Sequence, residues 1–250
     1  MTGFTTNALL YPLTKGDLLG HPFHGNQYEE VSSGAATEKT PPRPPVGQFQ
    51  LSGEEITKFA SFFHDKELQG GLESKFDYAS VQLSKMLGQD NPATKVDKFD
   101  GEPTLFRGCD TAGADSLTQP LTNYGKGGGQ GEGAGVYFAK DKDITREYVA
   151  NNERNGKNGC LVEAQVDPNA RLMTYDEYKQ SPVTIPNLEG TKLFSPDQQK
   201  AYDALSNEDK WYFTGFIATP ANVAILSGYQ GYTNNRVTVI TDRSVLKVKY

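Results

Sequence analysis

The sequence has little sulfur and no long apolar run. Its 250 residues include 2 cysteines and 3 histidines, and no apolar stretch reaches the length of about 18 residues that crosses a bilayer. We therefore expect no membrane-spanning helix. The chain starts without a basic, apolar leader, which predicts synthesis in a cytoplasm. Cys109 and Cys160 could form at most one disulfide.

Positive charge is also scarce. Lysine and arginine number 25 against 31 aspartates and glutamates, which gives a formal net charge of -6. An acidic surface gains no electrostatic attraction from phosphate backbones or anionic lipids. Neither a nucleic acid nor a membrane is expected as a partner. The 26 glycines and 14 prolines, with 36% apolar residues, predict that part of the chain stays outside a packed core.

Turn-forming residues dominate residues 1–48, which we predict to be an extended N-terminal segment. Residues 31–45 are rich in proline and small polar side chains, a composition typical of a solvated linker. Residues 20–28 (GHPFHGNQY) resemble a short segment in linkers of tailed-phage head proteins. This resemblance implies a phage origin and head proteins as partners. His21 and His24 have no further ligands nearby, so a turn is favoured and no metal site is predicted.

Residues 49–103 are predicted to form a helical subdomain of two amphipathic helices. Ser52 and Glu55 have the spacing of a capping box, and Gly88 favours the end of the second helix. The apolar residues on one face are Ile56, Phe59 and Phe63 in the first helix, and Phe76, Ala79, Leu83 and Leu87 in the second. Stripes of this kind are far more often core than cofactor contacts.

From residue 104 the pattern changes to short strand-like runs separated by Gly, Asn and Asp. The runs span 104–108, 136–139, 160–166 and 237–250, with helical patterns at 144–150, 196–205 and 219–228. In the third run, Cys160, Val162 and Ala164 alternate with other residues, which predicts one core face and a buried, unreactive Cys160. The predicted fold class is α+β.

Two features of this second half are candidates for a ligand-binding site. Arg107 ends a short apolar strand beside Gly108, an arrangement that suits a phosphate or carboxylate, although a lone arginine is more often a surface residue. The glycine-rich loop 125–135 leads into a strand rather than a helix and lacks a Walker motif, so alone it fits a surface loop as well as a ligand clamp. Tyr137 and Phe138 face opposite sides of that strand, so one side can pack while the other offers a phenol ring to a flat ligand.

Together these segments resemble the ADP-ribosyltransferase superfamily. The segments that carry the resemblance are Leu105–Gly108, Gly133–Ala139, Asp143–Tyr148, 159–167 as an edge strand, and 228–231 with 236–248 as a closing hairpin. The resemblance covers residues 104–250. It implies a split β-sandwich core that follows the N-terminal helices, with NAD as substrate.

The same resemblance implies roles for individual residues. Arg107 would fix a phosphate or ribose of NAD, and the Gly108 backbone would bond the nicotinamide amide. Tyr137 would stack on the nicotinamide ring, where cation–π attraction contributes about 0.5–2 kcal/mol. The further NAD-binding residues are Gly135, Phe138 and Tyr148.

The sequence departs from the family at its usual catalytic glutamate. Residues 232–236 (YTNNR) contain no carboxylate, and Asn235 aligns nearest, with Gln230 as the alternative. We take Asn235 as catalytic beside Arg107 and Tyr137. An amide can bond a ribose hydroxyl but offers no full negative charge. Glu132 and Glu163 are the carboxylates that could substitute.

The leading hypothesis is a phage mono-ADP-ribosyltransferase or NAD glycohydrolase that acts on a host component, with a protein as the favoured acceptor. It would work in the host cytoplasm or in association with the virion. The alternative is a non-catalytic virion protein that uses an ADP-ribosyltransferase fold for structure or binding. A relationship to RNA 2'-phosphotransferases is the weakest of the three, because the acidic chain does not favour an RNA substrate.

Overall fold

The computed structural model describes residues 43–65, 71–124, 131–183 and 194–250. Residues 20–28, most of the linker 31–45 and residues 125–130 of the glycine-rich loop lie outside the described residues. Residues 42–250 form one compact unit. None of the helices described in this unit is long and apolar enough to cross a membrane.

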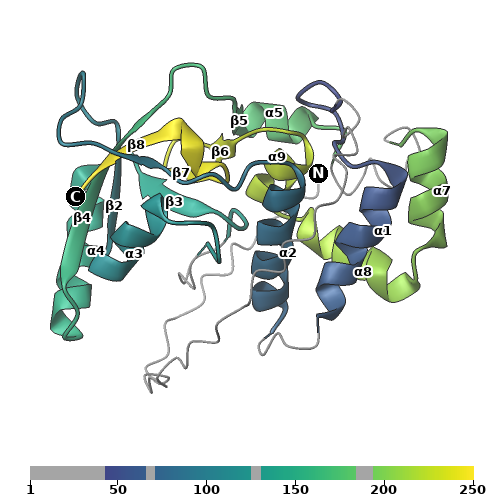
Figure 1. The fold of residues 1–250 in the computed structure, drawn as a ribbon, viewed down its shortest axis with the longest axis horizontal. Coiled ribbons are helices and arrows are strands. Elements are labelled where there is room, and N and C mark those ends of the chain that lie inside the picture. Colours follow the sequence, from purple (N-terminus) through teal and green to yellow (C-terminus); the bar gives the residue numbers. More distant parts are fainter. Residues whose placement is uncertain (1–42, 66–70, 125–130, 184–193) are drawn as a thin grey trace, which may run out of the picture. The chain divides into compact units, whose positions relative to one another are not determined.

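A mixed sheet forms one side of this unit (Figure 1). Its strands are β1 (Thr94–Lys95), β2 (Leu105–Asp110), β3 (Val136–Ala139), β4 (Gly159–Val166), β5 (Leu172–Thr174), β6 (Gly231–Thr233), β7 (Val237–Ile240) and β8 (Leu246–Lys249). They lie in the order β1-β8-β4-β2-β3-β7-β6-β5. Neighbours are antiparallel except β1 with β8 and β5 with β6. The α+β class is confirmed.

The sheet is nearly divided between β2 and β3. Along β2, every residue from Leu105 to Asp110 has a partner in β4, and all of β3 is paired with β7. In contrast, Phe106 with Ala139 is the single pair in the register between β2 and β3. The resemblance implied a split sandwich, whereas the described strands form one sheet whose two halves meet at one pair.

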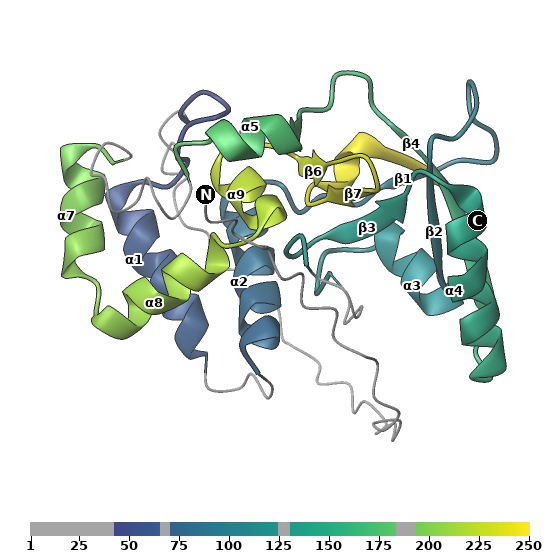
Figure 2. The same cartoon turned by 180° about the vertical axis from the view of Figure 1, so that it is seen from behind.

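Helices cover the sheet unevenly. Their bounds are α1 (Gly53–Ser61), α2 (Leu72–Met86), α3 (Thr111–Asp115), α4 (Lys142–Arg154), α5 (Tyr175–Gln180), α7 (Pro196–Ala204), α8 (Asn207–Phe216) and α9 (Pro220–Leu226). Helices α1, α2, α7 and α8 lie on the other side of the unit from the sheet (Figure 1). Helix α4 packs along β2 and β4, while α9 lies against β6 and β5 (Figures 1 and 2). The capping box of α1 is confirmed: Ser52 N–H donates to Glu55 Oε2 (2.8 Å), and Glu55 N–H donates to Ser52 Oγ (3.2 Å).

Two apolar cores form in this unit. The first core joins phenylalanines of α1 and α8 to strand residues such as Tyr232 and Val239. Many of its rings meet edge to face, as Phe59 and Phe216 do at 5.0 Å. The second core contains Leu105, Phe138 and mostly aliphatic residues of strands and neighbouring segments. Because the helices of residues 49–103 share the first core with β6 and β7, they pack as part of the same unit as the strands.

Arg43, in the last part of the predicted linker, packs against this unit. Its Nη1 bonds Glu55 Oε2 at 2.6 Å, and its Nη2 donates to the carbonyl oxygen of Met86 at 2.7 Å. The solvated linker interpretation therefore does not extend to Arg43.

The topology corrects two expectations. Residues 159–167 do not form an edge strand, because β4 lies between β2 and β8 and buries Val162 and Ala164 completely. Residues 236–248 do not close as one hairpin with 228–231: β7 pairs with β6, and the chain then crosses to place β8 beside β4. Arg243 anchors this crossing, because it is buried and donates to the carbonyl oxygen of Ser116 at 2.6 Å.

Candidate functional site

One face of the β2–β3 junction gathers several of the predicted residues. Phe106 and Ala139 are partners across the junction, so strand alternation places Gly108 and Tyr137 on their face. Helix α4 lies against this face. A Cβ added to Gly108 would overlap the carbonyl oxygen of Thr145 and lie 2.8 Å from Tyr148 Cβ. Glycine is therefore required at position 108 for α4 to approach, and this approach places Tyr148 beside it.

The backbone N–H and C=O of Gly108 point toward the gap where β3 has moved away from β2. Thr111 N–H donates to the carbonyl oxygen of Asn158 at 3.0 Å, in register with the β2–β4 pairs. Because hydrogen bonding alternates along an antiparallel strand, Arg107 and Cys109 direct their backbone groups to β4 and Gly108 directs its own to the other side. There the β2–β3 register has already ended at Phe106. A donor and an acceptor from one residue are the pair that a carboxamide requires.

Arg107 bridges the same divergence from the opposite face. Its side chain shares a face with Leu105 and Cys109, and Nη1 donates to the carbonyl oxygen of Tyr137 at 3.1 Å. The guanidinium thus supplies a contact between β2 and β3 where the strand pairing has ended. Its Nε is buried and has no hydrogen-bond partner in the described part of the chain. Burial raises the pKa of the neighbouring Cys109 thiol to about 11, although Arg107 acts against this rise.

Tyr137 is held by its hydroxyl group. The ring is partly buried against the first core, and the hydroxyl donates to the carbonyl oxygen of Gly133 at 2.5 Å. Burial raises the pKa of Tyr137 above the ordinary tyrosine value, and the negative charge of Glu132 acts in the same direction. The phenol therefore stays neutral and fixed in orientation. Gly135 allows β3 to reach this position, since a Cβ there would overlap Val239 Cγ1.

A carboxylate lies beside Tyr137. Asn234 Nδ2 donates to Glu132 Oε1 at 3.2 Å and also lies 3.4 Å from the hydroxyl oxygen of Tyr232. The charge of Glu132 contributes to raised pKa values at Tyr178 and Tyr232, after the larger effect of burial. We call Glu132, Tyr137, Tyr178, Tyr232 and Asn234 the Glu132 cluster.

Helix α9 fixes the segment that carries Glu132. Ala221 N–H donates to the carbonyl oxygen of Glu132 at 2.7 Å, and Ala134 N–H donates to Asn222 Oδ1 at 3.1 Å. Asn222 is itself buried and donates to the carbonyl oxygen of Phe216 at 2.8 Å. Within the described ranges, Glu132 makes no ion pair with lysine, arginine or histidine. Its carboxylate is thus positioned by neutral groups.

The structure separates the other predicted residues from this cluster. Asn235 is exposed in the turn between β6 and β7, and Phe138 is 1% exposed in the second core, where its side chain packs instead of facing a ligand. Gln230 is engaged locally, since its Nε2 donates to Asp242 Oδ2 at 3.1 Å and its Oε1 accepts the Arg171 N–H at 3.1 Å. Tyr148 is 59% exposed on α4.

Sequence reasoning missed Tyr178, Tyr232 and Asn234. Tyr232 could have been found, because it is opposite Val239, which is itself opposite Tyr137, so all three side chains share a face. Asn234 precedes the predicted Asn235 by one position, and the turn decides which amide reaches Glu132. Tyr178 gives no such signal, since only tertiary packing places α5 near β6.

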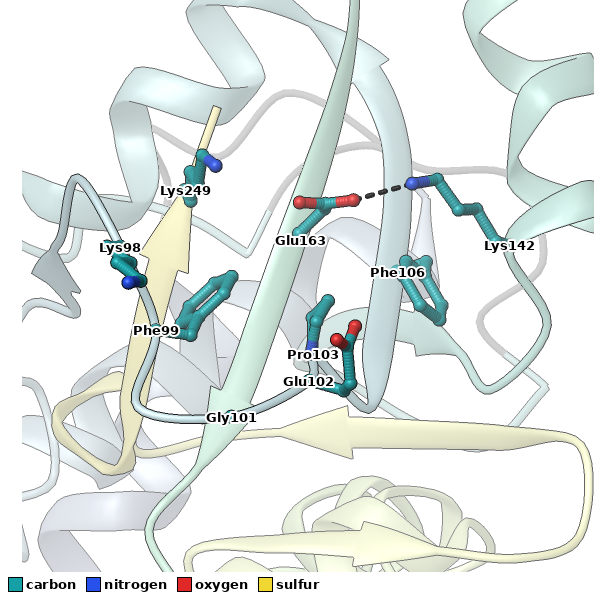
Figure 3. Close-up of a pocket in the computed structure, with 9 residues that line it drawn as sticks. All are labelled: Lys98, Phe99, Gly101, Glu102, Pro103, Phe106, Lys142, Glu163 and Lys249. Carbon is teal, nitrogen blue, oxygen red and sulfur yellow. Dashed lines mark hydrogen bonds and ion pairs between the residues drawn. The ribbon is translucent and has the colours of Figure 1, made fainter.

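Glu163 lies in a different place. It forms an ion pair with Lys142, Oε1 to Nζ at 2.6 Å, in a pocket of about 380 Å³ (Figure 3). None of Arg107, Tyr137 and Asn235 lines this pocket. Among the side chains that the structure describes, no group of three or more His, Cys, Asp or Glu residues could hold a metal ion.

The comparisons with known proteins give no relative. No protein-family model matches the chain. Neither the curated proteins nor the solved structures contain a significant match. The assignment of a function therefore rests on the geometry of the Glu132 cluster and of the β2–β3 junction.

Proposed function

We propose that residues 42–250 bind NAD at the β2–β3 junction and break its nicotinamide–ribose bond, with transfer of ADP-ribose to an acceptor. The observation that supports this proposal is the shared face of Gly108 and Tyr137, with Tyr148 of α4 beside Gly108 and the Glu132 carboxylate beside Tyr137. Nicotinamide needs a carboxamide partner, an aromatic surface and a nearby negative charge. Each of these is available at this face.

Nicotinamide binding would use the backbone and an aromatic ring. The N–H and C=O of Gly108 would bond the carboxamide, and the ring of Tyr137 would contact the cationic pyridinium. Cation–π attraction of about 0.5–2 kcal/mol is available for the charged nicotinamide and disappears once it leaves as a neutral base. Arg107 would act mainly by holding β3 at its distance from β2, with Nε remaining as a donor.

Glu132 would act in the bond-breaking step, in place of the predicted Asn235. The C1'–N bond breaks, its electron pair neutralises the pyridinium nitrogen, and positive charge develops on the ribose ring. A carboxylate without a cationic partner stabilises such charge and can bond a ribose hydroxyl. The acceptor then donates a lone pair to C1' and loses its proton to Glu132 or to solvent. When water is the acceptor, the products are ADP-ribose and nicotinamide.

The biological setting follows from the sequence and is part of the proposal. The resemblance of residues 20–28 to phage head-protein linkers suggests a phage product that reaches the host cytoplasm or stays with the virion. A host protein is the favoured acceptor, since the acidic chain offers no general attraction for nucleic acid.

Release of nicotinamide from labelled NAD tests this proposal. The full chain is incubated with NAD alone and with host lysate, and compared with Tyr137→Ala and Arg107→Ala. We expect release by the wild type and at least a tenfold loss in both variants, as for removal of about 1.4 kcal/mol of binding. The substitution Trp211→Ala, at an exposed aromatic residue of α8, is the control and should retain activity.

A non-catalytic virion protein is the second candidate. It is favoured because polar groups of the site already bond within the chain. The Tyr137 hydroxyl and the Arg107 guanidinium both donate to backbone oxygens of β3 or the segment before it. Under this alternative the wild type releases no nicotinamide and NAD leaves its melting temperature unchanged. Fixed stoichiometry in purified particles would then support a structural role.

A further inference from the structure

The pocket beside Glu163 is built from segments distant in the sequence. The loop 98–103 forms one side, the start of α4 forms another, and β8, β4 and β2 form the floor (Figure 3). Two contacts hold the loop in place: Lys247 Nζ lies 3.3 Å from Asp100 Oδ2, and Gln165 Nε2 donates to the carbonyl oxygen of Glu102 at 3.2 Å. The loop is therefore tied to the sheet on both sides of Gly101.

Flat apolar groups line the middle of this pocket. Phe99, Pro103 and Phe106 lie between Lys98 and Lys249 on one side and Lys142 on the other (Figure 3). Phe106 is partly exposed at the end of the β2–β3 pairing, and Lys142 Nζ lies 5.6 Å from the centre of its ring. Aromatic walls of this kind favour a planar ring.

The charges of the pocket differ from those of the whole chain. Three lysines and two glutamates line it, whereas the full sequence has a formal net charge of -6. Lys142 is neutralised by Glu163 at 2.6 Å. Lys98 and Lys249 are exposed, and neither forms an ion pair with another described residue. Two ammonium groups are thus available beside the aromatic walls.

We propose that this pocket binds a small anion that carries a flat ring. The phosphate or carboxylate of the ligand bonds Lys98 and Lys249, and the ring packs against Phe99 and Phe106. A volume of about 380 Å³ suits a ligand no larger than a mononucleotide. The test of this proposal is separate from that of NAD cleavage, because the pocket shares no lining residue with the Glu132 cluster. Phe106 lines the pocket and also belongs to the β2–β3 junction.

Titrations of the full chain followed by amide NMR shifts test the proposal. The probes are adenosine 5'-monophosphate and benzoate, which pair a ring with a phosphate or a carboxylate, together with adenosine and inorganic phosphate as the separate halves. We expect at least one ring-bearing anion to bind about tenfold more tightly than either half. The shifts should concentrate at Lys98, Phe99 and Lys249.

The proposal predicts opposite changes in ligand affinity for two variants. Lys98→Ala with Lys249→Ala should weaken binding about tenfold, whereas Glu163→Gln should strengthen it severalfold because it frees Lys142. Lys58→Ala with Lys200→Ala removes the same charge from exposed positions on α1 and α7 and serves as the control. All these positions are at least partly exposed, so the variants are expected to fold.

Several results would overturn the inference. They are equal affinity for inorganic phosphate alone, equal weakening in the control variant, and no binding of either ring-bearing anion. Shifts centred on Glu132 and Tyr137 would place adenosine 5'-monophosphate in the proposed NAD site and equally contradict it. Loss of nicotinamide release alone would leave this inference standing, since that measurement concerns the other site.

Discussion

Glu132 and Glu163 are two carboxylates of the same chain in opposite electrostatic settings. Glu163 lies 2.6 Å from the ammonium group of Lys142, so its charge is balanced within the protein. Glu132 receives a hydrogen bond from the neutral amide of Asn234 and lies near three tyrosines. Sequence alone offered both as substitutes for a missing catalytic glutamate. Their surroundings distinguish them.

The two carboxylates differ in how strongly each can attract a positive charge that develops on a substrate. A paired carboxylate has little remaining attraction for a positive charge that develops on a substrate, because its lysine repels that charge at nearly the same distance. An unpaired, partly buried carboxylate keeps its full attraction. The polar amide that holds Glu132 fixes its position without cancelling its charge. This contrast makes Glu132 the catalytic candidate and leaves Glu163 as a regulator of the charge in its own pocket.

The same substitution at both positions tests this contrast, because it exchanges a carboxylate for an amide of the same shape. Glu132→Gln keeps the shape and an oxygen that accepts from Asn234, but it removes the charge. We expect the rate of nicotinamide release to fall by about 100-fold or more, the size of effect seen when a single preorganised electrostatic group is removed from an active site. The dissociation constant for NAD should change much less. Stopped assays of nicotinamide and calorimetric titration of NAD separate these two quantities.

Glu163→Gln is the matched control for that experiment. It removes one carboxylate charge from the same face of the sheet, so a general electrostatic effect would act in both variants. We expect its nicotinamide release to stay within about twofold of the wild type, since Lys142 already balances the charge of Glu163 and Glu163 is not a member of the Glu132 cluster. Equal losses in the two variants would remove the distinction between the two carboxylates.

A second substitution tests the close approach of α4 that places Tyr148 beside Gly108. In Gly108→Ala the new Cβ meets the Thr145 carbonyl oxygen and Tyr148 Cβ, so α4 must move away from β2. We expect a loss of about 2 kcal/mol in the free energy of unfolding, as for other overpacked sites. Denaturant titration measures it. Gly131→Ala, where no atom lies within 4 Å of the added Cβ, should change stability little.

Much of the local structure could be predicted from sequence. The capping box at Ser52 and the stripe that begins at Ile56 define α1, because both depend on residues within one or two helical turns. Strand β3 was predicted with its correct bounds, since alternation and the preceding glycines are local signals. The opposite faces of Tyr137 and Phe138 are confirmed, with Phe138 in the second core and Tyr137 against the first.

The arrangement of distant segments could not be predicted in the same way. Strand β4 reads as an edge strand because nothing in its composition shows that β8 will pair with it after a crossing anchored by Arg243. Asn234, and not Asn235, lies beside Glu132 because of the conformation of the turn. A shift of the turn by one residue would bring Asn235 there instead. The two carboxylates likewise look alike until the partner of each is known.

The smallest expected effect concerns the phenol beside Glu132. Burial raises the pKa of Tyr137, so the folded protein holds this proton more tightly than the unfolded chain does. Its contribution to stability is therefore complete below the ordinary tyrosine pKa near 10 and is lost as pH rises above it. Between pH 9 and pH 11, the free energy of unfolding of the wild type should fall by about 1.4 kcal/mol relative to Tyr137→Phe. Parallel denaturant titrations measure this difference, and a constant gap between the two proteins would mean that the phenol is not buried beside Glu132.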